Sequence, residues 1–174
     1  MHRDEIADLL EEKYHVLLDW LEHQDDEKWM SGPKNKWTEG QQALHLLKSI
    51  KPLNDVLSMP RFMFKYTLGT ANREPREYDA IVSDYLEKLE NYKKTTTKSR
   101  KKLNVPKIQD KRYILTRLQV ESKKLQYKTR RISDKNLDTL VLPHPIMGKI
   151  LIREMLMWCA FHAEYHFKQL QESY

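Results

Sequence analysis

The pattern of apolar and polar positions predicts helices along nearly the whole chain. Apolar residues recur at three- and four-residue steps over residues 4–22, which is the spacing of a helix with one buried face. After a polar segment containing Ser31-Gly32-Pro33, Thr38 is followed three residues later by Gln41, as in a capping box. A second helix is therefore predicted to begin at Thr38.

Prolines and polar runs divide the rest of the chain. We expect Pro52 to bend the second helix and Pro60 to end it or its continuation. A connection over 59–77, a polar basic loop from Thr95 to near Pro106 and a loop over 137–145 separate the later elements. The remaining helices are predicted over residues 78–92, 109–132 and 147–171.

The last of these helices is apolar on most sides through its middle, from Ile150 to Phe161. Such a helix belongs in the centre of a bundle. No strand pattern and no internal repeat competes with the helical pattern. The predicted fold class is therefore all-α, a four-helix bundle with additional short helices, formed by residues 1–174 as one domain.

Composition supports a globular chain. Of 174 residues, 40% are hydrophobic and 32% are charged, and only four are glycine. No uncharged apolar run is long enough to span a bilayer, and no signal-peptide pattern follows Met1. The single cysteine, Cys159, excludes an internal disulfide. We therefore expect a cytoplasmic protein without a membrane partner.

Positive charge is concentrated in residues 93–131, which hold 15 Lys and Arg against two acids, Asp110 and Glu121. The rest of the chain is acidic, with 23 acids against 16 bases. Such a segment could attract nucleic acid, a membrane surface or an acidic small molecule, but charge runs commonly serve solubility. The segment shows no recognition-helix signature and no aromatic-rich basic motif, so no specific nucleic-acid partner is predicted.

Three histidines in apolar surroundings are the candidate chemistry. His162 and His166 are four residues apart in the last helix, so they share one face, and His45 lies in the second helix. Buried histidines of this kind need partners. They are either hydrogen-bonded core residues or, together, ligands of one divalent metal with open positions.

The other candidates are weaker. His2 and His23 are expected to be exposed, His15 lies between the polar and apolar stripes of its helix, and His144 is expected to shape the start of the last helix. Cys159 precedes His162 by three residues and could face the same way, as a ligand or as a small buried side chain. Three further residues near this face could support the site or belong to the core: Glu154, Trp158 and Gln169.

Longer metal motifs are absent. Glu12-Lys-Tyr-His15 is the only Glu-x-x-His match, whereas a di-iron bundle needs two such motifs with extra glutamates. His162-Ala-Glu-Tyr-His166 places its glutamate one position too late for a zinc protease helix.

Several segments also resemble a known family. Trp37-Thr-Glu-Gly-Gln-Gln-Ala-Leu-His45 is similar to the second-helix motif of the DinB-like metalloprotein superfamily, as is the stretch from Leu142-Pro-His-Pro-Ile-Met-Gly148 to Glu154, which runs on to His162 and His166. Phe64-Lys-Tyr-Thr-Leu-Gly-Thr-Ala-Asn-Arg73 resembles a connector in one branch of that group. The resemblance covers nearly the whole chain.

This resemblance implies a four-helix bundle, commonly dimeric, with zinc or nickel held by His45, His162 and His166. It implies a thiol S-transferase-like enzyme that joins a small-molecule thiol, such as bacillithiol, mycothiol or glutathione, to an electrophile. It leaves the catalytic residues beyond the metal ligands unknown. Two alternatives remain open: a metal-dependent hydrolase, and a non-catalytic helical protein with a structural or vestigial metal site and a basic surface for an acidic partner.

Overall fold

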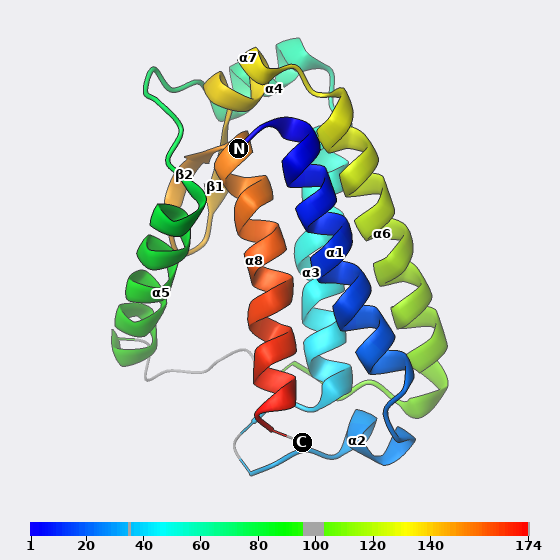
Figure 1. Cartoon of the computed structure of the whole chain (residues 1–174). Helices are drawn as coiled ribbons and strands as arrows, with labels where there is room; N and C mark the ends of the chain where they lie inside the picture. Colours follow the sequence, from blue (N-terminus) through cyan, green and yellow to red (C-terminus); the bar gives the residue numbers. More distant parts are fainter. Residues whose placement is uncertain (35, 96–102, 174) are drawn as a thin grey trace.

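Four long helices form the body of the molecule. The computed structural model describes residues 1–34, 36–95 and 103–173. The four helices lie side by side in Figure 1: α1 (Arg3–Glu22), α3 (Glu39–Leu57), α6 (Lys111–Arg131) and α8 (Ile152–Gln171). α1 and α3 each pack against both α6 and α8. The prediction of an all-α four-helix bundle is therefore confirmed.

The capping box predicted at the start of α3 is present. The backbone N–H of Gln41 donates to Thr38 Oγ1 at 3.2 Å, and the N–H of Thr38 donates to Gln41 Oε1 at 3.0 Å. These two bonds satisfy backbone donors that the first turn of a helix leaves free. α3 then runs through Pro52 and ends at Leu57, before Pro60.

Short helices occupy the segments that were predicted to be loops or connections. They are α2 (Asp26–Met30), α4 (Arg61–Leu68) and, in part, α7 (Asp134–Thr139). The 3-10 turn η1 (Ile108–Asp110) instead lies at the start of the helix predicted over 109–132 and precedes α6. Elements of one or two turns are stabilised by tertiary contacts rather than by their own periodicity, so their sequence pattern is weak. In α2, for example, Trp29 is fully buried and donates to the carbonyl of Lys107.

Gly40 allows α2 to lie close to α3. A Cβ atom at Gly40 would come within 2.7 Å of the carbonyl oxygen of Trp29, which is closer than real Cβ contacts. The first turn of α3 is thereby fixed against the indole of Trp29, and with it the helix that carries His45.

The structure contains a two-stranded hairpin where a loop over 137–145 was predicted. The prediction of a chain without strands is therefore wrong. β1 (Val141–His144) pairs antiparallel with β2 (Gly148–Leu151), and Gly148 adopts the left-handed conformation, with φ of 74°, that the turn requires. Strands of four residues are too short to show alternation. α8 consequently begins at Ile152 rather than at 147, where the apolar pattern starts.

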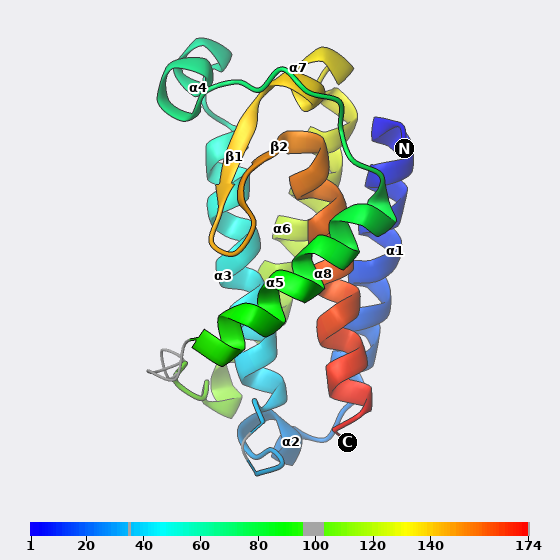
Figure 2. The ribbon, with the colours of Figure 1, turned by 90° about the vertical axis from the view of Figure 1, so that its left-hand side faces the viewer.

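α5 (Tyr78–Thr95) lies outside the bundle and crosses α8 obliquely (Figure 2). It extends the helix predicted over 78–92 by one turn. The basic loop predicted from Thr95 to near Pro106 falls partly on residues 96–102, which lie outside the described residues.

α8 is the central helix, as its apolar pattern predicted. Every residue from Ile152 to Ala163 is buried, because α1, α3 and α5 all pack against it. In the described part of the chain, no helix is long and apolar enough to cross a membrane.

Candidate metal centre

The structure brings His45, His162 and His166 together. His45 projects from α3, and the other two project from successive turns of α8. The Nε2 atom of His162 lies 3.2 Å from that of His45 and 3.1 Å from that of His166. One nitrogen from each ring lies within 4.8 Å of the others, so the three imidazoles point at one place.

This spacing fits a common ion. Imidazole nitrogens bound to Zn²⁺ at about 2.0–2.1 Å lie about 2.8–3.4 Å apart when their coordination angles are about 90–110°. Two of the three nitrogen pairs already have this separation. Among the described residues this is the one group of at least three His, Cys, Asp or Glu side chains that could hold a metal. Three neutral imidazoles leave coordination positions open, which is the donor set of a catalytic rather than a closed structural site.

Gln42 fixes the orientation of one ring. The Nδ1–H of His166 donates to Gln42 Oε1 at 2.9 Å. Because this bond holds the proton on Nδ1, the lone pair of Nε2 is directed at the other two rings. Gln42 lies one turn before His45 on α3 and is itself buried. A single turn of α3 therefore supplies both a candidate ligand and the group that orients another.

Burial keeps the three rings neutral. Burial lowers the pKa of His45. Burial, followed by the nearby His45, lowers the pKa of His166 to about 3. Burial also lowers the pKa of His162 well below its ordinary value, and repulsion from the neighbouring histidines adds to the shift. At neutral pH all three nitrogens can therefore donate a lone pair to an ion.

Aromatic rings enclose the three histidines. Trp158 stacks on His162, with ring centroids 4.5 Å apart and planes within 20°. Trp37 packs against His45 at 5.1 Å and lies parallel to His166 at 6.4 Å. His45 and Trp37 are half-buried, whereas His162 and His166 are about 5% exposed or less. The open side of the centre is therefore next to His45 and Trp37.

Cys159 does not belong to this centre. The proposed alternative of a thiolate ligand is wrong, because Cys159 is not among the clustered residues. It is buried within electrostatic reach of Tyr14 on α1, and burial raises the pKa of its thiol to about 12. A thiol held neutral in this way is a small apolar core side chain.

Of the other three residues expected near this face, Trp158 contacts the centre directly. Gln169 is linked to the centre through Tyr165. Its Nε2 donates to the hydroxyl of Tyr165, whose ring packs edge-on against His166. Glu154 lies at the start of α8, where it pairs with Arg73 and Arg76. It does not contact the histidines.

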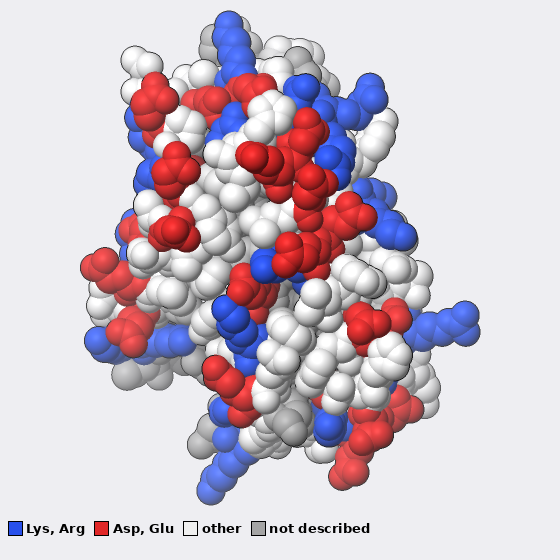
Figure 3. Space-filling model, in the orientation of Figure 1, with Lys and Arg blue, Asp and Glu red and all other residues white. Residues whose placement is uncertain are grey.

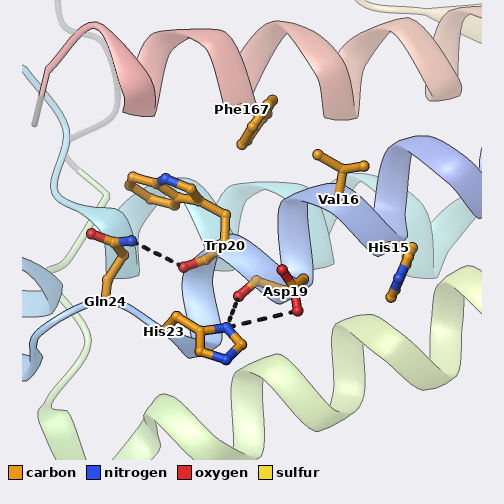
Figure 4. A pocket seen from close by; sticks show the side chains of 7 residues that line it. All are labelled: His15, Val16, Asp19, Trp20, His23, Gln24 and Phe167. Carbon is orange, nitrogen blue, oxygen red and sulfur yellow. Dashed lines mark hydrogen bonds and ion pairs between the residues drawn. The ribbon is translucent and has the colours of Figure 1, made fainter.

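The remaining histidines lie elsewhere. His2, His15 and His23 are exposed. His15 and His23 line a groove of about 290 Å³ between α1 and Phe167 of α8 (Figure 4). The Nδ1 of His23 is bonded there to the carbonyl of Asp19 on its own helix, and the two histidines belong to no metal-binding group among the described residues.

Three residues of the centre were not predicted: Gln42, Trp37 and Tyr165. A signal for Gln42 is present in the sequence, because it precedes His45 by three residues and therefore shares its helix face. Trp37 lies before the helix and Tyr165 contacts His166 from a neighbouring position on α8. Tyr165 follows His162 by three residues, so the same spacing rule places it near this face, whereas no spacing rule identifies Trp37.

Basic side chains of the segment 93–131 are mixed with acidic side chains from other parts of the chain. On the face in Figure 3, Lys and Arg are interspersed with Asp and Glu. Several of its side chains pair with acids from other parts of the chain. Lys111 contacts Asp26 at 2.8 Å, and Arg130 contacts Asp8 at 2.6 Å.

Comparisons with known proteins identify the fold. No family model matches the chain, and no curated protein matches it in sequence. Among solved structures, YfiT from Bacillus subtilis, described as a probable metal-dependent hydrolase with an unusual four-helix bundle topology, matches with a TM-score of 0.61 and 20% identity. That match covers 98% of this chain and 84% of YfiT. The chain has the fold of YfiT.

A second solved structure agrees. TT2238, described as a four-helix bundle protein, matches with a TM-score of 0.58 and 16% identity over 98% of this chain and 99% of TT2238. These likenesses confirm the fold that the resemblance to the DinB-like superfamily implied. At such identities they establish the fold alone, and the activity must be argued from the residues of the centre.

Proposed function

We propose that this protein is a metal-dependent enzyme in which His45, His162 and His166 hold one divalent ion, zinc or nickel, and that it transfers a small-molecule thiol to an electrophile. The convergence of three neutral imidazoles supports this proposal most strongly. When bound, such an ion supplies positive charge that lowers the pKa of a thiol or of water.

The chain's own residues provide orientation and exclude water. Gln42 keeps the proton of His166 on Nδ1, away from the centre. Trp158 covers the ring of His162, while Trp37 borders the half-buried side at His45. In the transfer, the thiol releases its proton to solvent, a sulfur–carbon bond forms, and the leaving group departs with the electron pair of its own bond.

Among the described residues, no base is in hydrogen-bond or ring contact with the three histidines, which favours a thiol over water as the nucleophile. In the described part of the chain, the hydrogen bonds and ring contacts of the three histidines lead to Gln42, Trp37, Trp158 and Tyr165. None of these accepts a proton readily at neutral pH. A thiol ionises more easily than water, so it needs no protein base here.

A metal-dependent hydrolase is the second candidate. It is favoured by the likeness to YfiT, whose description names that activity. An ester and amide panel, run beside the thiol assay with the same metal-loaded protein, separates the two reactions. Turnover of esters or amides without thiol consumption would replace the first proposal by the second.

The first test is a calorimetric titration of metal-stripped protein with Zn²⁺ and with Ni²⁺. We expect one ion per chain in the wild type and a loss of binding in His162→Ala, with the helical content unchanged by circular dichroism. His15→Ala, an exposed histidine on α1, is the matched control and should bind normally. Unchanged metal binding by His162→Ala would remove this residue from the ligand set.

The second test measures thiol consumption with an alkyl halide electrophile at fixed metal loading. Metal-dependent turnover that His162→Ala abolishes and His15→Ala preserves would support the transferase. A protein that binds the ion and turns over neither thiols nor hydrolytic substrates would instead be the non-catalytic binding protein.

A further inference from the structure

His144 carries a donor that the fold leaves unused. Its Nδ1 accepts the backbone N–H groups of Ile146 and Met147, at 3.1 and 3.0 Å, in the turn between β1 and β2. An atom that accepts two N–H groups cannot carry a proton itself, so the proton of the neutral ring is on Nε2. That Nε2 is buried and has no hydrogen-bond partner among the described residues.

Trp158 carries a second unused donor next to it. Its Nε1 is also buried without a partner in the described part of the chain. The indole lies between two histidines: its centroid is 4.3 Å from the ring of His144 and 4.5 Å from the ring of His162. The donor of Trp158 therefore belongs to a ring that stacks on His162, and the donor of His144 belongs to a ring that contacts Trp158.

Contacts between the rings cannot satisfy both donors. The planes of His144 and Trp158 are 76° apart, so the edge of one ring faces the other, and a weak N–H contact to an aromatic face can serve at most one of them. A buried donor without an acceptor destabilises the folded state, because it loses its hydrogen bond to water. The two donors belong to contacting rings, and neither has an acceptor among the described residues.

The surroundings favour an oxygen acceptor with negative charge. Lys88 of α5 lies within electrostatic reach of His144, and its ammonium is held in place by Asp84. Tyr85, also on α5, packs edge-on against both rings, with centroids 5.9 Å from His144 and 5.6 Å from Trp158. Tyr85 is therefore the aromatic neighbour that both rings share on α5.

We propose that His144 Nε2–H and Trp158 Nε1–H form a subsite that binds a carboxylate or carbonyl oxygen of the thiol whose sulfur occupies the metal centre. This inference rests on the proposed function, because it assumes that the substrate's other end is held by the ion at His45, His162 and His166. It defines the substrate as a thiol with an oxygen acceptor a few bonds from its sulfur.

The test uses cobalt-loaded protein and three thiols of one length. Visible absorption reports cobalt binding, and near-ultraviolet charge-transfer absorption reports a thiolate on the cobalt. 3-Mercaptopropionate carries a carboxylate, 3-mercaptopropionamide a carbonyl, and 1-propanethiol neither. The wild type should bind the first two at least about 10-fold more tightly than 1-propanethiol, as expected for two added hydrogen bonds.

Two variants remove one donor each. Trp158→Phe keeps an aromatic ring against His162 but lacks the N–H. His144→Asn lacks Nε2 but keeps a side-chain oxygen that can accept the turn's backbone N–H groups. Each variant should reduce the preference over 1-propanethiol to about 3-fold. The matched controls are Trp20→Phe, whose ring packs against Phe167 in the outer groove, and His15→Asn; both should keep the full preference.

The outcomes separate the two proposals. Protein that binds no cobalt would overturn the proposed function and this inference with it. Protein that binds cobalt and all three thiols equally would overturn the subsite alone. A preference that persists unchanged in both Trp158→Phe and His144→Asn would also overturn it, and the visible spectrum of cobalt shows in each case that the centre itself is intact.

Discussion

At the scale of single residues, Gln42 decides how well His166 can serve as a ligand, because it holds the proton of that ring on Nδ1. Gln42→Leu should lower metal affinity by about 10–100-fold, as is typical when the partner of a ligating histidine is lost. Competition with a chromophoric chelator measures this. Gln24→Leu, at a half-buried glutamine outside the centre, is the control, and equal affinities of the two variants would contradict the role of Gln42.

A second prediction at this scale concerns how the ionisation of Glu39 affects stability. Its side chain is fully buried at the start of α3, its carboxylate oxygens have no partner among the described residues, and burial raises its pKa to about 7. The folded state therefore holds this proton between the ordinary pKa near 4.5 and pH 7, where the unfolded state has released it. Stability contributed by Glu39 is present below pH 4.5 and is lost as pH rises to 7.

Glu39→Gln should remove this loss. The variant and the wild type should be similarly stable at pH 4, and the variant should be more stable by about 2–3 kcal/mol at pH 8. Urea unfolding of both proteins at several pH values measures this difference in the free energy of unfolding. The buried histidines titrate in both proteins, so their contribution cancels in the difference. A constant difference across this range would show that Glu39 does not titrate as described.

The sequence predicted the histidines of the centre but not their surroundings. Residues four apart on a helix must share a face, so the pairing of His162 with His166 follows from spacing. The same rule suggested Cys159, wrongly, because a helix buried on all sides has faces toward several neighbours. Which neighbour a buried residue meets depends on how the helices pack, and that information is not local in the sequence.

At the scale of elements, Glu154 joins the segment before α5 to the start of α8. Arg73 donates two bonds to its carboxylate, at 2.6 and 2.5 Å, and Arg76 donates from both its side chain and its backbone. Burial alone raises the pKa of Glu154, but the bonds from Arg73 and Arg76 outweigh this effect and hold the pKa at about 2. The carboxylate is therefore charged and fully paired at neutral pH.

Glu154→Gln should lower the free energy of unfolding by about 3 kcal/mol at pH 7, because it removes the charged partner of two arginines. Hydrogen exchange should increase in α5 more than in the four bundle helices. Glu90→Gln, which removes an exposed pair with Lys94, should change stability by less than about 1 kcal/mol. Equal effects of the two substitutions would show that Glu154 does not anchor α5.

The long elements were predictable and the short ones were not. α1, α3, α5 and α6 begin and end within about three residues of their predicted bounds, because periodicity and the capping box at Thr38 act locally. The hairpin Val141–Leu151 was missed because its strands are held by pairing with each other and by the turn at His144. α2 and α4 were missed because single buried residues, Trp29 and Phe64, attach them to the bundle.

At the scale of the whole molecule, self-association as a two-fold dimer remains a prediction from the family resemblance. Exposed apolar side chains on α4, including Phe62 and Tyr66, are compatible with an interface. Light scattering at micromolar concentration should give twice the chain mass of 21.0 kDa. A mass equal to that of one chain would contradict it.

The last prediction concerns the basic segment 93–131. We expect it to bind nucleic acid weakly and without sequence preference at low salt, and not to bind near physiological ionic strength. Its described charges are spread around α6, and many are already paired, as Lys111 is with Asp26 and Arg117 and Lys124 are with Glu121. Paired and dispersed cations release few counterions from a duplex, so affinity should fall to background by about 0.15 M salt.

A salt titration of binding to two labelled duplexes of unrelated sequence measures this. Both duplexes should dissociate in parallel, since the described charges of the segment lie around α6 and several are paired with acids, as Lys111 is with Asp26. Tight binding of one duplex at physiological salt would assign the basic segment a nucleic-acid partner. The protein would then carry a basic binding surface on α6 in addition to the candidate metal centre between α3 and α8, which is neutral and lined by aromatic rings.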